Sequence, residues 1–284
     1  MKGEIGTQCH DRGSVSREGC RLPGPRLDPS VCTESLSWAD QRRLTEPTIE
    51  RYLFYMGDRV TEYYNRTAVS YEDLHGFEQE HLIALRKGLN YFPLVRSVLD
   101  VGCGTGRGLA ELTSLRPDVE LHGIDPAEGL LELAKQKVPG ATLHLGSGTQ
   151  LPFENGRFDI VVATGILHHV EDPAGIIAEM FRVARLGVIV SDHNNFAFGS
   201  SKAKRVRMLL RSLGLLNLAS FIKQGFKRQG YSDEDGWWYP YSLLDNYADF
   251  ANRSENLVIF PTRRPSACEN FIFDQSHVAI VGLK

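Results

Sequence analysis

The chain lacks the features of a secreted, disulfide-stabilised or membrane-spanning protein. Its 284 residues include only five cysteines, an odd and scattered set, so we expect no disulfide scaffold and a reducing, cytoplasmic environment. The N-terminus has no apolar signal core, and uncharged apolar stretches such as residues 212–222 are too short to span a bilayer. Acidic residues number 35 against 32 basic ones, which gives no general attraction to nucleic acid or to an anionic membrane.

The composition that remains, 42% hydrophobic and 24% charged, is that of a globular protein with a substantial core. Residues 1–43 are rich in Gly, Pro, Ser and Arg and show no apolar period, so we expect a disordered leader. Three of the cysteines lie there, too far apart for a zinc site, which uses pairs two to four positions apart. Residues 44–92 form a predicted N-terminal helical cap, with apolar residues at three- and four-residue steps (Ile49, Leu53, Met56, Val60).

Residues 93–284 form the predicted core, in which short apolar runs alternate with helical stretches. This alternation is typical of a parallel sheet covered by helices on both faces. The predicted fold class is therefore α/β: a Rossmann-like, doubly wound, mostly parallel seven-stranded sheet, which binds ligands beyond the carboxyl ends of its strands. The expected strands are 97–101, 119–124, 141–145, 158–163, 187–191, 257–260 and 277–283, with helices at 107–115, 127–136 and 173–184.

One long excursion, residues 200–255, interrupts the alternation and is the predicted substrate cover. Residues 201–232 hold eight basic residues and no acidic one, interleaved with leucines. The pattern fits an amphipathic helix pair with a solvated basic face, or a surface over 202–228 that attracts an anionic substrate or an anionic membrane. Aromatic residues crowd the second half, where they either pack the cover or stack on a substrate. The substrate-binding candidates are Trp237, Trp238, Tyr239 and Tyr241.

The most specific motif follows the first core strand and reads DVGCGTG over residues 100–106. Glycines at alternate positions allow a sharp turn and a close approach of the backbone to a ligand, and the next helix presents its N-terminal amides at the same place. A dinucleotide loop needs G-x-G-x-x-G, but the third position would be Arg107 or Leu109. The spacing is instead D-x-G-x-G-x-G. Taken alone, it is also compatible with a tight strand–helix turn.

At this loop the chain resembles the class I methyltransferases that use S-adenosylmethionine, and four further segments match the family in order. They are residues 123–126, 146–153, 158–163 and 167–173. The resemblance implies S-adenosylmethionine as the cofactor, with a carboxylate at Asp125 for the ribose hydroxyls and the 146–153 loop beside the adenine. The implied cofactor-binding residues are Asp100, Gly102, Cys103, Gly104, Gly106, Asp125, Pro126, Gly146, Ser147, Gly148, Thr164 and His169.

The chain departs from the family pattern at two places. Ser147 stands where the family often has an acidic residue that contacts the adenine amino group. The usual Pro-Gly-Gly turn before the fifth strand is missing, and residues 182–187 run directly into that strand. The first departure affects the adenine contact, whereas the second is not expected to affect cofactor binding.

Two clusters of polar residues follow the fourth and fifth strands, and histidine has a suitable pKa for a general base. They are His168-His169 and Asp192-His193, and the predicted catalytic residues are His193, His169 and Asp192. A metal site shared by the two clusters is the alternative. We predict no metal, because the carboxylate arrangement of the magnesium-dependent catechol-type enzymes is not recognisable. The family arrangement also implies that a tyrosine of the N-terminal cap faces the cofactor's sulfonium.

The sequence thus predicts an enzyme that transfers a methyl group from S-adenosylmethionine to a small-molecule or glycan-precursor acceptor, at oxygen, with a histidine as base. A tRNA or protein methyltransferase is the first alternative. The basic stretch favours it, but the near-neutral total charge and the lack of an added binding domain oppose it, so nucleic acid is not the expected partner. A non-catalytic, cofactor-binding scaffold protein is the second. The oligomeric state and the pathway are not predicted.

Overall fold

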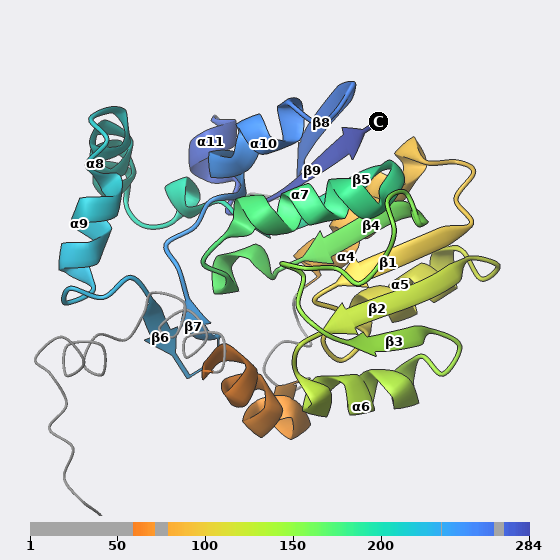
Figure 1. Cartoon of the computed structure of the whole chain (residues 1–284). Helices are drawn as coiled ribbons and strands as arrows, with labels where there is room; N and C mark the ends of the chain where they lie inside the picture. The colour runs from red at the N-terminus through yellow and green to blue at the C-terminus, as the bar shows by residue number, and fades with distance from the viewer. Residues whose placement is uncertain (1–58, 72–78, 234, 264–269) are drawn as a thin grey trace, which may run out of the picture. The chain divides into compact units, whose positions relative to one another are not determined.

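The structure is a computed structural model that describes residues 59–71, 79–233, 235–263 and 270–284. Its main sheet has seven strands: β1 (Ser97–Val101), β2 (Glu120–Asp125), β3 (Thr142–Leu145), β4 (Phe158–Thr164), β5 (Ala184–His193), β8 (Asn256–Pro261) and β9 (His277–Leu283). They lie in the order β3-β2-β1-β4-β5-β9-β8 (Figure 1). β1 to β5 are parallel, and β9 is antiparallel to both of its neighbours. The predicted doubly wound, mostly parallel sheet is confirmed.

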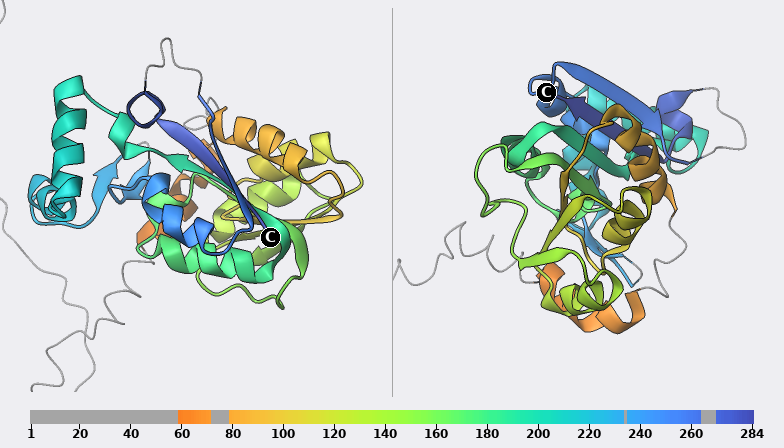
Figure 2. Two further views of the ribbon diagram at one scale, coloured as in Figure 1. Left: turned by 90° about the horizontal axis from the view of Figure 1, so that it is seen from above. Right: turned by 90° about the vertical axis from the view of Figure 1, so that its right-hand side faces the viewer.

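Helices cover both faces of this sheet, as the side view in Figure 2 shows. α4 (Glu80–Gly88), α5 (Arg107–Leu115) and α6 (Glu128–Lys137) pack on one face, and α7 (Pro173–Val183) and α10 (Tyr247–Ala251) on the other. Two apolar clusters result, one on each side of the sheet. The strands between them are buried on both faces, which is why β4 reads as a continuous apolar run rather than an alternating one.

The chain passes from α7 into β5 without a linker. α7 begins at a capped end, where the Asp172 side chain accepts a hydrogen bond from the Gly175 N–H and Pro173 fills the first helical position. It ends at Val183, and β5 starts at the next residue, Ala184. The missing Pro-Gly-Gly turn therefore shortens the connection. β5 pairs with β4 from its first residue, with a shift of register between Phe158 and Ile160.

The predicted cover leaves the sheet after β5 and contains two helices and a hairpin. α8 (Ser201–Ser212) and α9 (Leu216–Lys223) confirm the expected helix pair, and neither has a buried residue. They stand away from the sheet, at the left of Figure 1. A two-stranded sheet of β6 (Gly230–Ser232) and β7 (Gly236–Trp238) follows and was not predicted. The rest of the excursion differs from the prediction, because Leu243 and Phe250 are fully buried and belong to the core.

Short turns of 3-10 helix complete the described chain: η1 (Ala68–Ser70), η2 (Leu89–Tyr91), η3 (Leu167–His169), η4 (Asn195–Ala197) and η5 (Leu243–Asn246), with a short helix α11 (Phe271–Asp274) before β9. Residues 59–67, which fall within the predicted cap, are helical. The leader 1–43 and the cap residues 44–58 and 72–78 lie outside the described residues. Within the described part of the chain, no helix is both long and apolar enough to cross a membrane.

Asp159 joins three strands at the end of the sheet opposite the carboxyl ends of the parallel strands. One carboxylate oxygen accepts the Arg96 N–H at 2.7 Å, and the other accepts Nε of Arg185 at 3.0 Å. Burial raises the pKa of this carboxyl group, but the hydrogen bonds from Arg185 and Arg96 outweigh burial and lower it overall. The ionised form therefore stabilises the fold.

Replacing Asp159 with Asn should lower the free energy of unfolding at pH 7 by about 1–3 kcal/mol, because the Arg185 partner and the Arg96 N–H lose a charged acceptor. Since the folded-state pKa lies below the unfolded one, the carboxylate's contribution is present above the unfolded pKa and is lost as the pH falls through the folded one. Urea unfolding should therefore show that the difference in free energy of unfolding between wild type and variant decreases from pH 6 to pH 3. The exposed Asp118→Asn serves as control, and a difference independent of pH would contradict the assignment.

Candidate active site

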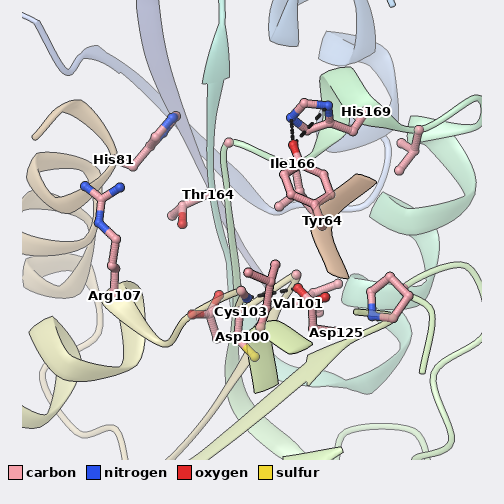
Figure 3. A pocket seen from close by; sticks show the side chains of 18 of the residues that line it. Tyr64, His81, Asp100, Val101, Cys103, Arg107, Asp125, Thr164, Ile166 and His169 are labelled. Atoms are coloured by element: carbon pink, nitrogen blue, oxygen red, sulfur yellow. Dashed lines mark hydrogen bonds between the residues drawn. The ribbon is translucent and has the colours of Figure 1, made fainter. Parts of the chain in front are cut away.

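A pocket lies at the carboxyl ends of β1, β2 and β4, where the strand order reverses (Figure 3). The glycine loop forms its floor between β1 and α5, with positive φ angles of 70° at Gly102, 52° at Gly104 and 80° at Gly106. A side chain at Gly102 would also meet Ile166, whose Cγ2 lies 2.5 Å from the Cβ position. The first two glycines line the pocket, whereas Gly106 packs on α6 and caps α5. The motif therefore needs glycine for its backbone.

Asp125 ends β2 and holds the glycine loop in place. One of its oxygens accepts the Gly104 N–H at 2.9 Å, and the other accepts the Ala127 N–H at 2.8 Å. Burial raises its pKa to about 6, against the lowering effect of these two N–H groups. Each carboxylate oxygen retains a lone pair, so the side chain could accept two hydroxyl groups from a ligand.

Asp100, the last but one residue of β1, is a second acid in the pocket wall and is fully buried. Among the described residues, its Oδ1 has no hydrogen-bond partner. Burial, with a smaller contribution from the charge of Asp125, raises the pKa of Asp100 to about 8. A buried carboxyl group with an unmet oxygen, beside a second carboxylate, is suited to a positively charged ligand group.

The remaining predicted cofactor residues are divided between the pocket wall and its support. Cys103, Pro126, Ser147, Gly148 and Thr164 line the pocket. Gly146 stands behind it, since a Cβ there would meet the side chain of Ile124 at 3.0 Å. The hydroxyl of Ser147 lies 3.0 Å from that of Thr149, so a hydrogen bond within the predicted adenine-side loop stabilises it.

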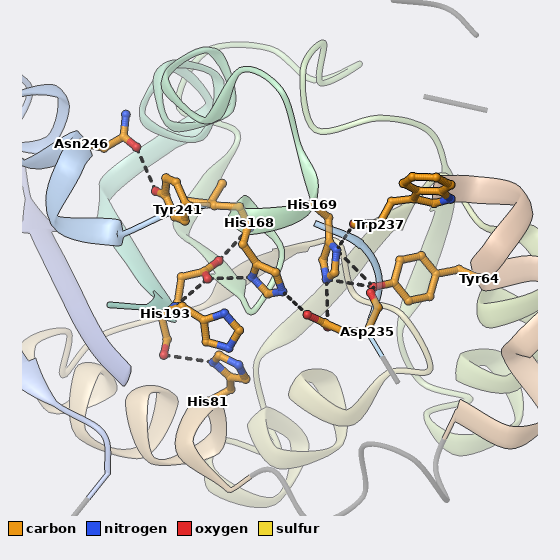
Figure 4. Close-up of polar contacts among 12 residues, drawn as sticks. Tyr64, His81, His168, His169, His193, Asp235, Trp237, Tyr241 and Asn246 are labelled. Atoms are coloured by element: carbon orange, nitrogen blue, oxygen red, sulfur yellow. Dashed lines mark hydrogen bonds and ion pairs between the residues drawn. The ribbon is translucent and has the colours of Figure 1, made fainter. Parts of the chain in front are cut away.

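Tyr64, from the helical segment 59–67, closes the pocket opposite the glycine loop. Its hydroxyl lies 2.8 Å from Nε2 of His169, while Nδ1 of the same ring lies 2.8 Å from the carbonyl oxygen of Trp237 (Figure 4). A carbonyl only accepts, so Nδ1 carries the proton and Nε2 accepts the phenol hydrogen. Burial, followed by the charge of His168, lowers the pKa of His169 to about 3. Both ring nitrogens of His169 are therefore engaged.

His168 lies between two carboxylates. Its Nδ1 is 2.7 Å from Oδ1 of Asp192, and its Nε2 faces Oδ2 of Asp235 at 3.6 Å. Burial alone would lower the pKa of His168, but its bond to Asp192 and the charge of both carboxylates raise it well above the ordinary value. Asp192 also accepts the N–H groups of Leu167 and His193. It is fully buried and absent from the pocket wall, so it is placed to orient His168 rather than to touch a ligand.

His193, the last residue of β5, faces the pocket directly. Its ring packs on those of His168 and His277, with centroids 4.3 Å and 4.7 Å away. Among the described residues, neither of its ring nitrogens has a hydrogen-bond partner. Burial and then the charge of His168 lower its pKa to about 4, so the ring is neutral near pH 7. Of the predicted catalytic residues, His193 alone has a free lone pair in the pocket.

The four predicted substrate-binding aromatic residues do not line this pocket. The Trp238 ring covers Gly230 of the adjacent strand, and the Trp237 ring packs against Tyr231. Tyr239 contributes its backbone N–H to the carbonyl of His168. Tyr241 is a core residue whose hydroxyl donates to Asn246. In this structure these residues build the cover and attach it to η3.

Sequence reasoning missed two acidic or basic residues of the site. Asp235, between β6 and β7, reaches both His168 and His169. Its only signal was its position directly after the long stretch without acidic residues. His81 of α4 lines the opposite wall, with Nδ1 3.1 Å from the Ser191 hydroxyl, and its histidine type alone gave no signal.

Comparison with known families identifies the segment that builds this pocket. The family model of the methyltransferase domain matches residues 99–191, from β1 to β5. That range contains the glycine loop, Asp125 and the η3 histidines. Residues 99–191 are therefore similar to the methyltransferase domain, whose cofactor is S-adenosylmethionine.

Curated relatives match the chain over part of their length. An uncharacterized methyltransferase of Schizosaccharomyces pombe is 33% identical over 110 residues, which are 35% of this chain and 40% of the relative. A demethylmenaquinone methyltransferase of Lactococcus lactis is 31% identical over 140 residues, 46% of this chain and 56% of the relative. The chain thus spans about half the length of these relatives.

Solved structures resemble the chain in fold. An S-adenosylmethionine-dependent methyltransferase of Thermotoga maritima superimposes with a TM-score of 0.51 at 19% identity, covering 78% of this chain and 98% of the other. A protein of Pyrococcus horikoshii gives 0.50 at 18% identity, covering 76% and 95%. At these identities the likeness concerns the fold alone.

The pocket of this chain fits S-adenosylmethionine chemically. The ligand carries an amino group and a sulfonium, both cationic, and the pocket offers the unmet Oδ1 of Asp100 and the carboxylate of Asp125. The positions of Gly102 and Gly104 admit a ligand against the backbone that a Cβ would obstruct. Asp125 would hold the ribose hydroxyls and Asp100 the amino end.

Asp100→Asn should weaken cofactor binding and stabilise the ligand-free protein. Because the pKa of Asp100 is raised in the folded state, the stability that this group contributes is fully present below its unfolded-state pKa. That stability is lost as the pH rises toward 8. In thermal melts without ligand, the unfolding midpoint of the variant should rise relative to that of wild type between pH 5 and pH 8. S-adenosylmethionine should raise the midpoint of the variant less than that of wild type. Asp118→Asn is the control. An unchanged pH response would show that Asp100 is not the titrating group.

Proposed function

We propose that this chain transfers the methyl group of S-adenosylmethionine to a hydroxyl oxygen of a small molecule. The observation that carries the proposal is the free, neutral imidazole of His193 in the wall of the cofactor pocket. S-adenosylmethionine, when bound, supplies an electrophilic methyl group, so alignment contributes most of the rate. A hydroxyl acceptor must in addition lose its proton, and a positioned imidazole can take it.

The residues around His193 have supporting roles in this proposal. Asp192 fixes η3 at the end of β5 through Leu167 and His168, and so sets the direction in which the pocket histidines face. His169 holds the phenol of Tyr64 across the cofactor pocket through Nε2 and the Trp237 carbonyl through Nδ1. We therefore assign the proton transfer to His193 and the positioning of the pocket walls to Asp192 and His169.

The form of the pocket favours a small acceptor over a macromolecule. Tyr64 and Asp235 line it from the side away from the sheet, and the Tyr64 hydroxyl also donates toward the Asp235 carbonyl, 3.4 Å away. A tRNA or a protein side chain would have to enter past these contacts. The cover's aromatic rings lie outside the pocket, so no stacking platform for a sugar supports a glycan precursor over other small molecules.

The proposal is tested by following the methyl group from the labelled cofactor. The purified chain, with ¹³C-methyl S-adenosylmethionine, is incubated in turn with a small-molecule extract, with total tRNA and with a protein extract from the source cells. We expect label in the small-molecule fraction, with a carbon chemical shift typical of an O-methyl group. Label in tRNA or protein would favour the first alternative. Cofactor binding with no label in any fraction would favour a scaffold protein.

Once the labelled product is known, His193→Gln should lower kcat by about 10²–10⁴-fold, because the acceptor proton then has no positioned base. Calorimetry should show an unchanged Kd for S-adenosylhomocysteine, since the glycine loop, Asp100 and Asp125 are untouched. His144→Gln, at the distant His122–His144 stack, is the matched control. A variant of His193 with wild-type kcat would exclude it as the base.

The composition of the helix pair α8–α9 supports the hypothesis that the chain meets its substrate at an anionic lipid surface. Six apolar side chains in this helix pair, in the turn that joins its helices and just after α9 are more than half exposed. They are Val206, Leu209, Leu213, Leu218, Ile222 and Phe226. Lys204, Arg207 and Arg211 bond to the body of the protein, while Lys202, Arg205, Lys223 and Lys227 are exposed. Exposed leucines among cations, with no acidic residue between 201 and 232, suit an anionic interface.

Flotation with vesicles should therefore show binding to phosphatidylglycerol and not to phosphatidylcholine, weakening as salt is raised. The triple variant Leu209→Ser, Leu213→Ser, Leu218→Ser should bind at least about tenfold more weakly, since each buried leucine is worth roughly 1.5 kcal/mol or more. The double variant Leu94→Ser, Leu145→Ser, at exposed leucines elsewhere, is the control. Equal binding by the triple variant, or self-association of the lipid-free protein through this face, would overturn the proposal.

A further inference from the structure

Three side chains direct donor atoms at one point where the cover meets the pocket. His168 and His169 come from η3 after β4, and Asp235 comes from the β6–β7 hairpin (Figure 4). Oδ2 of Asp235 lies 3.6 Å from Nε2 of His168, and Oδ1 lies 3.5 Å from Nε2 of His169. One donor atom from each residue lies within 4.8 Å of the other two. All three residues line the pocket.

Each histidine is held from behind by its other ring nitrogen. Nδ1 of His168 is bonded to Asp192, and Nδ1 of His169 is bonded to the carbonyl of Trp237. A histidine that binds a metal almost always donates its second N–H to a carboxylate or to a backbone carbonyl, which fixes the tautomer and the direction of the ring. Here both kinds of support are present, and both rings turn Nε2 toward Asp235.

One of the donor atoms, Nε2 of His168, is not satisfied by the described part of the protein. Nε2 of His168 is buried and has no hydrogen-bond partner among the described residues, because 3.6 Å to Asp235 exceeds hydrogen-bond distance. Nε2 of His169 accepts from the Tyr64 hydroxyl, but that hydroxyl has a second acceptor at the Asp235 carbonyl, 3.4 Å away. A small rotation of the phenol group would free the His169 lone pair.

We propose that His168, His169 and Asp235 bind a divalent transition-metal ion, with Zn²⁺ the best match. Two imidazoles and one carboxylate form a donor set of this class, and three protein ligands leave a position open to a ligand in the pocket. Donors bound about 2.0 Å from one zinc ion at tetrahedral angles lie roughly 3.3 Å apart, close to the two distances to Asp235. The carboxylates of Asp235 and Asp192 provide the negative charge that a buried cation requires.

A second group of donors, His168, Asp192 and His193, is also close enough for a metal but suits one less well. Asp192 already accepts one imidazole N–H and two backbone N–H groups and does not line the pocket. In the first group, His168, His169 and Asp235, the bond from Nδ1 of His168 to Asp192 holds the His168 ring in place. The two arrangements exclude each other, and the first leaves every supporting bond in place.

This site differs from the sequence-based prediction of no metal, and it stands independently of the proposed methyl transfer. The decisive ligand, Asp235, lies in the cover, 67 residues after His168 in the chain. A bound ion would therefore join the hairpin to η3. The three ligands and His193 line the same pocket.

The test measures metal binding by the full chain. The protein is stripped with chelator, its cysteine thiols are alkylated so that they cannot bind metal, and it is equilibrated with Zn²⁺ and then with Co²⁺. We expect one tightly bound zinc ion by elemental analysis, and a Co²⁺ spectrum with the visible bands of a nitrogen–oxygen site and no thiolate charge-transfer band. Asp235→Asn and His169→Gln should each weaken zinc affinity by at least about 100-fold.

Matched controls make the result specific. Asp233→Asn changes the neighbouring aspartate of the same hairpin, and His144→Gln changes a histidine outside the pocket; both should keep wild-type zinc affinity. The Asp235 variant lies at the partly exposed hairpin, and circular dichroism confirms that each protein is folded. Failure of the alkylated wild type to bind zinc, or equal affinity in the Asp235 and His169 variants, would overturn the proposal. Neither outcome depends on any transfer activity.

Discussion

The active site depends on the buried pair formed by Asp192 and His168. Asp192 has no exposed surface at the end of β5, so its charge is tolerable only with full compensation. The imidazole of His168 and the N–H groups of Leu167 and His193 supply that compensation. Because one partner lies on β5 and the other on the turn after β4, the pair fixes the relative position of the two strand ends. Removing either partner would leave an unpaired charge in the core.

That pair also determines how the inserted cover attaches to the sheet. His168 accepts the Tyr239 N–H at its carbonyl, and its ring faces Asp235, while the neighbouring ring of His169 donates to the Trp237 carbonyl. The hairpin is thus attached mainly through its backbone and one carboxylate. Its aromatic side chains are free to pack on one another, which explains why they lie outside the pocket although the composition suggested a substrate platform.

The sequence was sufficient to predict the sheet and the cofactor pocket because both depend on local patterns. Continuous apolar strands such as β4 indicate burial on both faces, and the D-x-G-x-G-x-G spacing reflects the positive φ angles of one turn. The acceptor side depends on contacts between distant segments. Nothing local to Asp235 indicates that it faces His168, and nothing local to Tyr64 indicates that its hydroxyl meets His169, 105 residues later. Adjacent histidines at 168 and 169 look equivalent in sequence, yet one ring lies between two carboxylates and the other bonds to a phenol.

The two regions of the pocket differ in electrostatic character, and this difference supports the division of roles. The cofactor region has two carboxyl groups, Asp100 and Asp125, with raised pKa values that a cationic ligand would lower again. The acceptor region has imidazoles, of which His169 and His193 are held neutral by burial and by the positive charge of His168. A cationic donor is therefore attracted to one region, and proton acceptors are available in the other. Because His168 contacts Asp192 of the sheet, Asp235 of the cover and the ring of His193, the position of the hairpin and the charge environment of His193 depend on each other.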